Sequence, residues 1–537
     1  MAPPRTPPPW PTIAASAIIA LLAYFAVKLI QHRRSYRDLP KPPHHFLWGH
    51  LKLMGEVMSL FPRNVHFQVA ITTMAQKYRL PGLWYLDLWP MADPQLIITD
   101  PELALYVTVL KNHPKHYVEA ELMDPIMGKG NIATTEGHIW KAAHNMLAPA
   151  FAASHVRNTI GGVAEEVMVF RSILEDLAHS GAIFSLEDLL KSMIFDVIGR
   201  VTFNYSLEAQ KRGSPLLSHF TDICSAALIE RDTWNPVKSF SARRNRLAAT
   251  RKLDPLLEKI IRGRFEELQR GDADLSKRRG LSIIDLVLRE RLEEAQKTGK
   301  DALDANFMAV AATHIKTLLL AATGTTTDTL CFTYMLLSAH PEVVQKLREE
   351  HDSVFTPGIE ASYAMLQQDP HKLSDLHYTT NVIKEVLRFY PVGNTARAED
   401  STGSITYNGK QYSTRGQMIC PVQHAMHMDP SIFPNASAFD PDRFSRNDAP
   451  RNAWRPFERG PRACLGQTLA MDDMKVALLL TVRDFDFACA ALKPSKTQLV
   501  PWTDLDLTFG DRAFQEFILE ARPRDGMPMT VKKAIGA

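Results

Sequence analysis

The chain has 537 residues, 45% of them hydrophobic and 23% charged, and a formal net charge of +3. This is an ordinary globular composition, and so small a net charge argues against a nucleic-acid-binding protein. The five cysteines include no CxxC pair, which excludes a zinc ribbon or a cysteine-held cluster and makes a disulfide framework unexpected.

The amino end predicts a membrane anchor. Residues 10–30 read WPTIAASAIIALLAYFAVKLI, about the 20 residues that a bilayer core requires, with Lys28 as the only charge. Basic residues crowd the side that follows, namely Arg33, Arg34 and Arg37. The positive-inside rule therefore places residues 1–9 in the lumen and the rest of the chain in the cytosol. A cleaved signal peptide is the alternative, although its basic residues should precede the apolar run.

Residues 31–45 are basic and proline-rich, and we expect a stiff spacer there between membrane and domain. Residues 46–537 show no repeat, low-complexity tract or internal linker, which predicts one large domain. A proline-free stretch from about Asp304 to Ala339 predicts a helix roughly 50 Å long. Its middle, AATGTTTDT, is rich in weak helix formers, so we expect either a local distortion or simple crowding against a neighbour.

Strand signals are short and lie late in the chain. SITYNGKQYS predicts a hairpin that turns at Asn408–Gly409. FILEARPRDGMPMTVKKA predicts a second hairpin that turns at Asp525–Gly526. The expected fold is therefore mainly α with small β-sheets.

The decapeptide FERGPRACLG holds the most informative cysteine. It lies beside arginines, whose positive charge favours the thiolate. The spacing FxxGxRxCxG resembles the haem-ligand loop of the cytochrome P-450 family at Phe457, Gly460, Arg462, Cys464 and Gly466. The resemblance implies that Cys464 is the axial ligand of a haem b iron, that Arg462 pairs with a haem propionate, and that the glycines let the backbone approach the macrocycle. A free loop cysteine is the alternative, and five matched positions argue against it.

A buried ionic network is the second point of resemblance. KEVLR places Glu385 and Arg388 on one helix face, and FDPDRF supplies Arg443, with Asp442 where the family has glutamate. The resemblance implies that Glu385, Arg388 and Arg443 form a network behind the haem. Loss of one member would leave unpaired buried charge. For KEVLR alone, a surface ion pair is the alternative.

WKAAH resembles the family's WxxxR, whose side chains reach the haem propionates. Trp140 matches, whereas His144 replaces the arginine and need not be charged at neutral pH. Arg397, in NTARAED, is a further candidate for a propionate contact. Ordinary core packing is the alternative for Trp140.

The proline-free helix resembles the family's oxygen-binding helix, usually AGxDTT. Thr325 matches the threonine that orders water for proton delivery, and is the expected catalytic residue. Ala322 replaces a glycine, and Gly324 replaces the acid of the proton relay. Asp328 lies one turn further along and is the candidate substitute.

The resemblance covers about residues 46–531 and looks most like fungal microsomal members. It implies the cytochrome P-450 fold, preceded by one transmembrane helix, in a single-pass protein of the endoplasmic reticulum membrane with a cytosolic haem-thiolate domain. Electrons would come from NADPH through a separate cytochrome P-450 reductase, because only 73 residues follow Cys464. Cytochrome b5 is a second expected partner.

The implied activity is that of a monooxygenase, which uses O2 to hydroxylate or otherwise oxidise a lipophilic small molecule. A terpenoid or polyketide intermediate of secondary metabolism is the expected substrate, with fatty acids, sterols and xenobiotics as rivals. An isomerase, dehydratase or peroxide-using enzyme without a reductase is the alternative activity, supported by the missing acid at Gly324. A non-catalytic haem-binding sensor is a third hypothesis.

Overall fold

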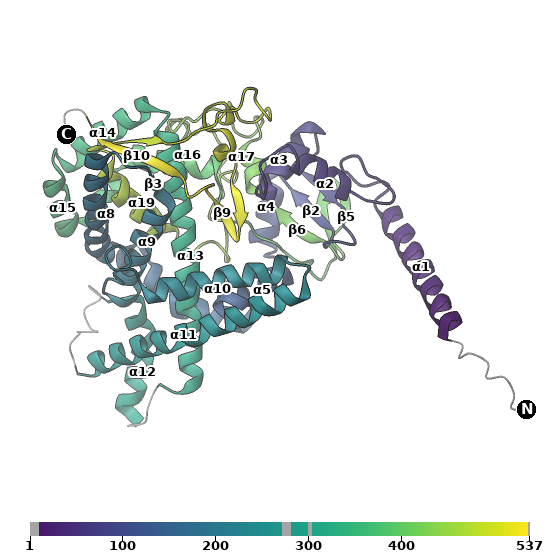
Figure 1. Ribbon diagram of the computed structural model, residues 1–537, viewed down its shortest axis with the longest axis horizontal. Helices are drawn as coiled ribbons and strands as arrows, with labels where there is room; N and C mark the ends of the chain where they lie inside the picture. Colours follow the sequence, from purple (N-terminus) through teal and green to yellow (C-terminus); the bar gives the residue numbers. More distant parts are fainter. Residues whose placement is uncertain (1–9, 271–280, 299–302, 535–537) are drawn as a thin grey trace, which may run out of the picture.

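The computed structural model describes residues 10–270, 281–298 and 303–534, so the segment 1–9 expected in the lumen lies outside it. Helices dominate, as predicted (Figure 1). In chain order they are α1 (Trp10–Ser35), α2 (Leu51–Met58), α3 (Phe67–Lys77), α4 (Pro101–Leu105), α5 (Tyr117–Met127), α6 (Gly137–Leu147), α7 (Ala153–Val156), α8 (Ile160–Ser180), α9 (Leu186–Phe203), α10 (Pro215–Asp232), α11 (Pro236–Gln269), α12 (Ile283–Thr298), α13 (Ala305–Leu337), α14 (Pro341–Phe355), α15 (Ile359–Gln368), α16 (His377–Phe389), α17 (Gln423–His427), α18 (Arg443–Arg446), α19 (Gln467–Thr481) and α20 (Asp506–Phe509).

The strands are short and form small sheets beside the helices. They are β1 (Leu83–Leu86), β2 (Gln95–Ile98), β3 (Phe184–Ser185), β4 (Ser404–Tyr407), β5 (Lys410–Ser413), β6 (Met418–Pro421), β7 (Phe485–Cys489), β8 (Glu516–Ile518), β9 (Glu520–Arg522) and β10 (Pro528–Lys533). In one sheet β2 pairs antiparallel with β1 and parallel with β6. In another, β10 lies between β3 and β7.

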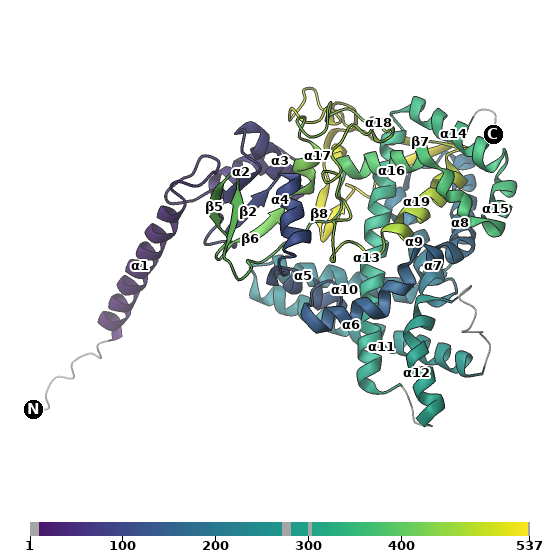
Figure 2. The same ribbon diagram turned by 180° about the vertical axis from the view of Figure 1, so that it is seen from behind.

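Helix α13 is the long helix predicted from the proline-free stretch, and it crosses the centre of the domain (Figures 1 and 2). Asp304 caps its amino end by accepting from the Phe307 amide over 2.8 Å. The helix continues unbroken through the threonine-rich middle. There the hydroxyls of Thr325, Thr329 and Thr333 each donate to the carbonyl one turn earlier. These bonds satisfy the hydroxyl groups within the helix itself.

The first predicted hairpin is confirmed and the second is wrong. β4 pairs with β5 across Asn408–Gly409, in the register Tyr407 to Lys410. β9 instead pairs with β8 through a tight turn at Leu519, where φ is +85°. The chain does turn at Asp525–Gly526, but β10 then pairs with β7 and β3. A local turn signal cannot reveal that distant strands supply the partners.

Helix α1 projects from one end of the domain (Figure 2). It contains a stretch, Ile13–Ser35, long and apolar enough to cross a membrane, of which 6% is buried. α13 passes the same test but is 56% buried, as expected of a core helix. The prediction of a stiff spacer over residues 31–45 is wrong in part, because α1 runs on to Ser35 and Tyr36 is 1% exposed in a core shared with β1. The spacer therefore packs as part of the domain.

Candidate functional site

The cysteine loop closes just before α19. The Cys464 amide donates to the Phe457 carbonyl over 2.9 Å, and the Ala463 amide donates to the Gly460 carbonyl over 3.0 Å. Gly460 has φ +81°, and a Cβ there would lie 2.8 Å from Cγ2 of Val109. Both the left-handed backbone and the close neighbour require glycine at this position.

The surroundings of the Cys464 sulfur suit a ligand thiolate. Burial raises the pKa of the thiol, and a hydrogen bond from the Gly466 amide opposes that rise. The side chain still keeps accessible surface, so protein atoms surround the sulfur without covering it. α19 begins at Gln467, and the amino end of a helix favours negative charge. A metal bound to the sulfur would complete the deprotonation.

Arg462 lies against Trp140 of α6, and Trp140 in turn contacts His144. Its guanidinium carbon is 4.7 Å from the Trp140 ring centroid, and the Trp140 and His144 rings are 5.0 Å apart. Glu136, directly before α6, accepts from Arg462 Nη2 at 2.8 Å. The structure thus brings the three predicted residues together, and it adds an acid that the WxxxR pattern does not indicate.

Arg397 fits an anionic ligand best. It is 1% exposed, and its Nη1 donates to the His113 carbonyl over 2.8 Å. Among the described residues, its Nε and Nη2 are buried and have no hydrogen-bond partner. Leaving the N–H groups of a buried charge unpaired is costly. A haem propionate would satisfy both, so these donors fit the expected cofactor.

Lys115 is a cation at this site that the sequence motifs did not indicate. A β-bridge joins it to Arg397, and its Nζ lies 2.8 Å from Glu119 Oε2 and 3.0 Å from Thr395 Oγ1. Burial is the main cause that lowers the pKa of Lys115, and the charges of Arg397 and Arg462 lower it further. Three cations therefore converge here. KNHPKHY carries no recognisable pattern, so only the fold reveals this lysine.

Glu385 stands at the centre of a buried ionic network. Its two oxygens accept from Arg388 over 2.9 Å each, and Oε1 also accepts from Arg443 Nε over 3.0 Å. All three side chains are 0–1% exposed. Their other donors reach backbone carbonyls between residues 427 and 438. Asp442 takes no part, because it pairs with Lys346 at the surface over 2.7 Å.

His427 connects this network to the cysteine loop. Its Nδ1 lies 3.2 Å from the Arg388 carbonyl, and the Arg455 amide donates to its Nε2 over 3.2 Å. The pattern requires a neutral ring with its proton on Nδ1. Burial, helped by the Arg388 charge, holds the pKa of His427 well below its usual range. The segment HAMHMDP therefore links two motifs that sequence reasoning treated separately.

Thr325 lies in α13, but its hydroxyl proton is already engaged. Oγ1 donates to the Ala321 carbonyl over 2.7 Å, which leaves its lone pairs free to accept from water. Asp328 is only 2% exposed. Asp328 lies close enough to Arg522, the last residue of β9, to affect its pKa. Burial would lower the pKa of Arg522, but the negative charges of Glu187 and Asp328 raise it. The surroundings of Asp328 therefore differ from those of the partly exposed Thr325.

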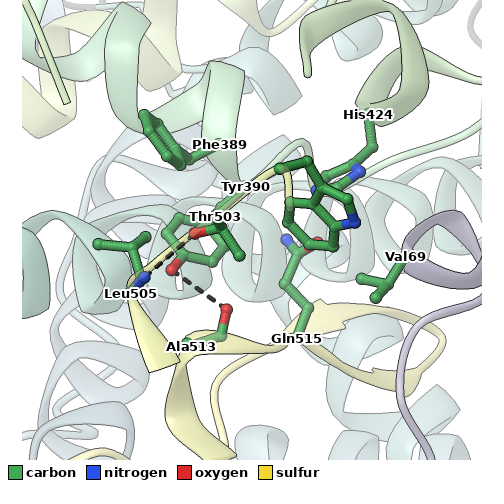
Figure 3. Close-up of a pocket in the computed structure, with 9 residues that line it drawn as sticks. Val69, Phe389, Tyr390, His424, Thr503, Leu505, Ala513 and Gln515 are labelled. Carbon is green, nitrogen blue, oxygen red and sulfur yellow. Dashed lines mark hydrogen bonds between the residues drawn. The ribbon is translucent and has the colours of Figure 1, made fainter. Parts of the chain in front are cut away.

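Two cavities have no predicted site residue in their lining. Figure 3 shows one of about 10 Å³, lined by Tyr390, His424, Trp502 and Gln515 among others. That volume suits a single water molecule, so it is no substrate site. A larger cavity of about 160 Å³ lies between α5, α10 and Leu519 at the β8–β9 turn.

Known proteins resemble this chain over most of its length. The family model described as cytochrome P-450 matches residues 39–507. The cytochrome P-450 monooxygenase polC of Polytolypa hystricis is 31% identical over 535 residues, covering 95% of this chain and 93% of polC. Cytochrome P-450 monooxygenase ptmG of Penicillium ochrochloron is 28% identical over 473 residues, covering 88% and 86%. Cytochrome P-450 4A24 of Sus scrofa is 27% identical over 493 residues, covering 89% and 92%.

The fold agrees with that of a solved structure. The haem domain of cytochrome P-450DA superposes with a TM-score of 0.72 at 22% identity, covering 92% of this chain and 97% of that one. At this identity the likeness shows the fold alone. The family match and the relatives, however, extend over the cysteine loop and the Glu385 network. The chain therefore belongs to the cytochrome P-450 monooxygenase family, haem-iron enzymes that oxidise small molecules.

Proposed function

We propose that the protein is a membrane-anchored haem-thiolate monooxygenase that oxidises a lipophilic small molecule. The observation that carries the proposal is the position of Cys464, whose amide donates to the Phe457 carbonyl over 2.9 Å and whose accessible side chain lies directly before α19. A thiolate in this position would suit a ligand of the haem iron, and backbone hydrogen bonds would tune its electron density. Bound haem would supply the activation of O2 and the transfer of one oxygen atom to the substrate.

The haem carboxylates would be bound by the converging cations. Arg397 offers two nitrogen donors that have no hydrogen-bond partner among the described residues, and the charges of Arg397 and Arg462 both lower the pKa of Lys115. Arg462 is at present paired with Glu136, so it would share its donors between that carboxylate and a propionate. Trp140 lies against Arg462 and would line the same side of the cofactor site, with His144 packed against Trp140.

Thr325 would hold a water molecule for proton delivery as an acceptor. Its own proton is committed to Ala321, so the water must donate to Oγ1. No carboxylate occupies position 324, and Asp328 is buried. Protons would therefore arrive along water rather than through a carboxylate beside Thr325.

The substrate would enter between α5, α10 and the β8–β9 turn. The cavity of about 160 Å³ there is lined by apolar residues such as Leu122, Ile126 and Leu519 and also by the charged residues Glu121, Glu230 and Arg231. Such a lining suits an apolar molecule with a few polar groups. We propose an intermediate of secondary metabolism, a terpenoid or polyketide, as the substrate, with fatty acids, sterols and xenobiotics as rivals; fungal relatives are named as monooxygenases, which supports the oxidation of a small molecule.

The anchor α1 would hold the protein in the endoplasmic reticulum membrane with its domain in the cytosol. Its apolar stretch is followed by basic residues, which supports that orientation. A separate NADPH-cytochrome P-450 reductase in the same membrane would then supply the electrons, with cytochrome b5 as a second donor.

Two measurements test the proposal together. The reduced, haem-loaded protein with carbon monoxide should give the red-shifted Soret band of a thiolate ligand, and Cys464→Ala should abolish it. With reductase, NADPH and O2 consumption should rise in the presence of a lipophilic substrate from a panel. A normal Soret band in Cys464→Ala protein would sink the ligand assignment. A thiolate band without any substrate-stimulated consumption would overturn the monooxygenase activity.

The absence of an acid at Gly324 favours a second candidate, an isomerase, dehydratase or peroxide-using enzyme that needs no reductase. Product formed from substrate alone, or from substrate with peroxide, at the same rate with and without reductase would select it. Gly324→Asp distinguishes the two further. More product per NADPH in that variant would show that a missing relay limits a true monooxygenase.

A further inference from the structure

Three charged side chains line the cavity between α5, α10 and the β8–β9 turn, namely Glu121, Glu230 and Arg231. Glu230 is already neutralised, because Arg246 of α11 donates to its Oε2 over 2.8 Å. Glu121 is exposed and forms no ion pair with any residue that the structure describes. Of the two acids, Glu121 is therefore the one whose negative charge stays uncompensated.

Arg231 is held in place from two sides. Its Nε and Nη2 donate to the two carboxylate oxygens of Asp232, the second over 2.9 Å. Its guanidinium carbon lies 5.7 Å from the ring centroid of Phe517 in β8. That ring is itself fixed, since it packs edge-on against His66 at 5.1 Å and against Phe67 at 6.0 Å. The guanidinium is thus oriented before any ligand arrives, which reduces the entropy lost on binding.

The Nη1 group of Arg231 remains available to a ligand. It has no hydrogen-bond partner among the described residues, and 34% of the side chain is exposed. Arg231 lines the cavity together with Leu122, Ile126 and Leu519, so Nη1 is a polar donor in largely apolar surroundings. A few polar groups of this kind fix the orientation of a ligand in its site.

The charges around this donor disfavour two kinds of ligand group. Asp232 neutralises Arg231, so a carboxylate would gain little from the guanidinium and would be repelled by Glu121. A protonated amine has no lone pair with which to accept from Nη1. A hydroxyl or carbonyl oxygen can accept from Nη1 without bringing a charge into the cavity.

We propose that Arg231 determines substrate specificity by donating from Nη1 to a neutral oxygen, a hydroxyl or a carbonyl, on the lipophilic substrate. The inference rests on the proposed function, in which the substrate enters at this cavity, and it narrows the substrate class. The molecule would already carry one oxygen when this enzyme oxidises it elsewhere. Hydrocarbons and ionised fatty acids would be poorer ligands, because they lack the neutral oxygen.

Binding of four molecules that share one carbon skeleton tests this: dehydroabietane, its alcohol dehydroabietinol, dehydroabietic acid and dehydroabietylamine. Equilibrium dialysis against the full-length, haem-loaded protein in lipid nanodiscs gives each dissociation constant, after subtraction of the uptake by empty nanodiscs. The parent protein should bind the alcohol more tightly than the hydrocarbon, the acid or the amine. An alcohol that binds no more tightly than the hydrocarbon, or less tightly than the acid or the amine, would overturn the inference.

Variants then assign the preference to one side chain. Arg231→Met should weaken binding of the alcohol about tenfold, and binding of the hydrocarbon much less, because only the alcohol accepts from Nη1. Arg231→Lys should not restore the affinity, since an ammonium group lacks the planar fork that Asp232 holds. Arg244→Met, at an exposed position of α11, is the matched control and should bind the alcohol like the parent protein. Equal affinity for the alcohol in Arg231→Met and Arg244→Met would contradict the assignment.

Two further readouts keep the inference separate from the proposed function. With reductase, Arg231→Met should raise the KM for the alcohol about tenfold and change kcat little, because the contact is the same before and during the reaction. The carbon monoxide Soret band should remain that of a thiolate ligand in every variant. Alcohol binding that is insensitive to Arg231→Met, with this band intact, would overturn the inference alone. Absence of the band in the parent protein would overturn the proposed function.

Discussion

Arg397 and Arg462 differ in what they already bind. Arg462 is paired with Glu136, whereas two donors of the buried Arg397 have no partner among the described residues. An unpaired buried charge is tolerated when a ligand supplies the counter-charge, so Arg397 should contribute most to holding the cofactor.

Replacing Arg397 by methionine should therefore weaken haem binding more than it weakens the fold. A hydrogen bond to a charged group contributes about 1.5–3 kcal/mol, so haem transfer to an acceptor apoprotein should be about tenfold faster or more. Arg415→Met, at an exposed position, is the matched control. Equal rates of haem loss in the two variants would remove Arg397 from the cofactor site.

The Glu385 network predicts that one substitution, Glu385→Gln, lowers the free energy of unfolding strongly. Glu385→Gln keeps the shape but leaves Arg388 and Arg443 without their shared anion, which should cost about 3–5 kcal/mol in the free energy of unfolding. Asp442→Asn, one residue from Arg443, breaks only a surface pair with Lys346 and should cost less than about 1 kcal/mol. Urea unfolding of both variants distinguishes them, and similar costs would contradict the central position of Glu385.

Thr325→Ala should separate electron consumption from product formation. The variant loses the acceptor for the proposed water while the helix keeps its backbone bonds. We expect a larger fraction of consumed O2 to appear as peroxide, and Thr325→Ser to restore the coupling. Peroxide release unchanged from the parent protein would show that protons travel by another route.

Local sequence patterns predicted the cysteine loop, but they did not predict the residues from distant segments that surround it. The spacing of five positions around Cys464 identifies the loop, and the structure shows why glycine stands at Gly460, whose φ is +81°. Lys115 and Glu136 escaped prediction because their proximity to Arg397 and Arg462 depends on how distant segments meet. His427 escaped for the same reason, since a buried histidine between two backbone groups has no sequence signature.

At the scale of elements, local sequence patterns predicted the long helix α13 well, but they predicted the pairing of β10 wrongly. α13 begins and ends within two residues of the predicted proline-free stretch, because its capping residue and its length are local properties. β10 was assigned the wrong partner, since its pairing with β7 is set by tertiary packing. The spacer prediction for residues 31–45 failed at Arg33 and Tyr36, whose burial depends on Asp87 and β1 far along the chain.

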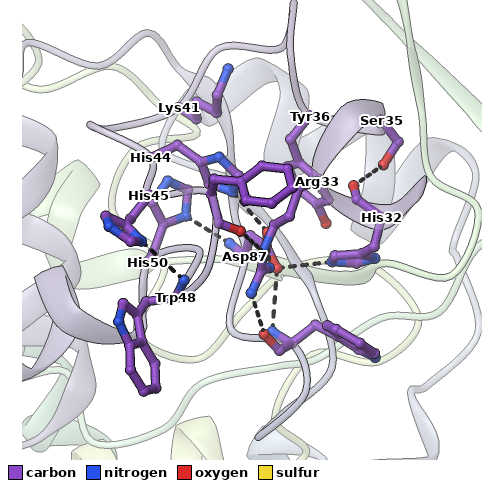
Figure 4. A network of polar contacts seen from close by, with 12 residues as sticks. His32, Arg33, Ser35, Tyr36, Lys41, His44, His45, Trp48, His50 and Asp87 are labelled. Carbon is purple, nitrogen blue, oxygen red and sulfur yellow. Dashed lines mark hydrogen bonds and ion pairs between the residues drawn. The ribbon is translucent and has the colours of Figure 1, made fainter. Parts of the chain in front are cut away.

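The attachment of α1 can be tested at a single arginine. Arg33→Gln removes the ion pair with Asp87 (Figure 4) and should loosen the loops whose carbonyls its other N–H groups bind, with amide exchange about tenfold faster or more around residues 44–50 and 85–91. Arg34→Gln, which changes the neighbouring exposed arginine, should leave exchange unchanged. The same exchange rates in both variants would mean that Arg33 does not hold the loops.

For the molecule as a whole, buried histidines predict acid sensitivity. Burial lowers the pKa of His50 to about 4 and those of His66, His351 and His424 to about 3. Below about pH 6.5 the unfolded chain takes up protons at these rings and the folded protein does not. Each histidine should therefore reduce the free energy of unfolding by about 1.4 kcal/mol per pH unit as the pH falls from about 6.5 toward its folded pKa.

One histidine can be isolated from the rest. Buried carboxyls such as Asp473, whose pKa is raised by burial, stabilise the fold as the pH falls and so oppose the effect of the histidines. The pH dependence of a single variant is therefore more informative than that of the parent protein. His351→Leu should make the loss of stability between pH 6.5 and 5 smaller by about 2 kcal/mol. His138→Leu, at an exposed position, should leave it unchanged. Urea unfolding at the two pH values measures both, and an unaltered pH dependence for His351→Leu would contradict the assignment.

The cysteine loop also has a consequence for the order of assembly. Arg455, just before it, donates to Thr108 Oγ1 over 2.7 Å across 347 positions of sequence, and Gly460 lies against Val109. Contacts this distant form slowly, because a long chain segment must first be closed. During synthesis the early partner must wait for nearly the whole chain to leave the ribosome. We expect the cysteine loop to be among the last parts to form, so that haem capture completes folding rather than beginning it.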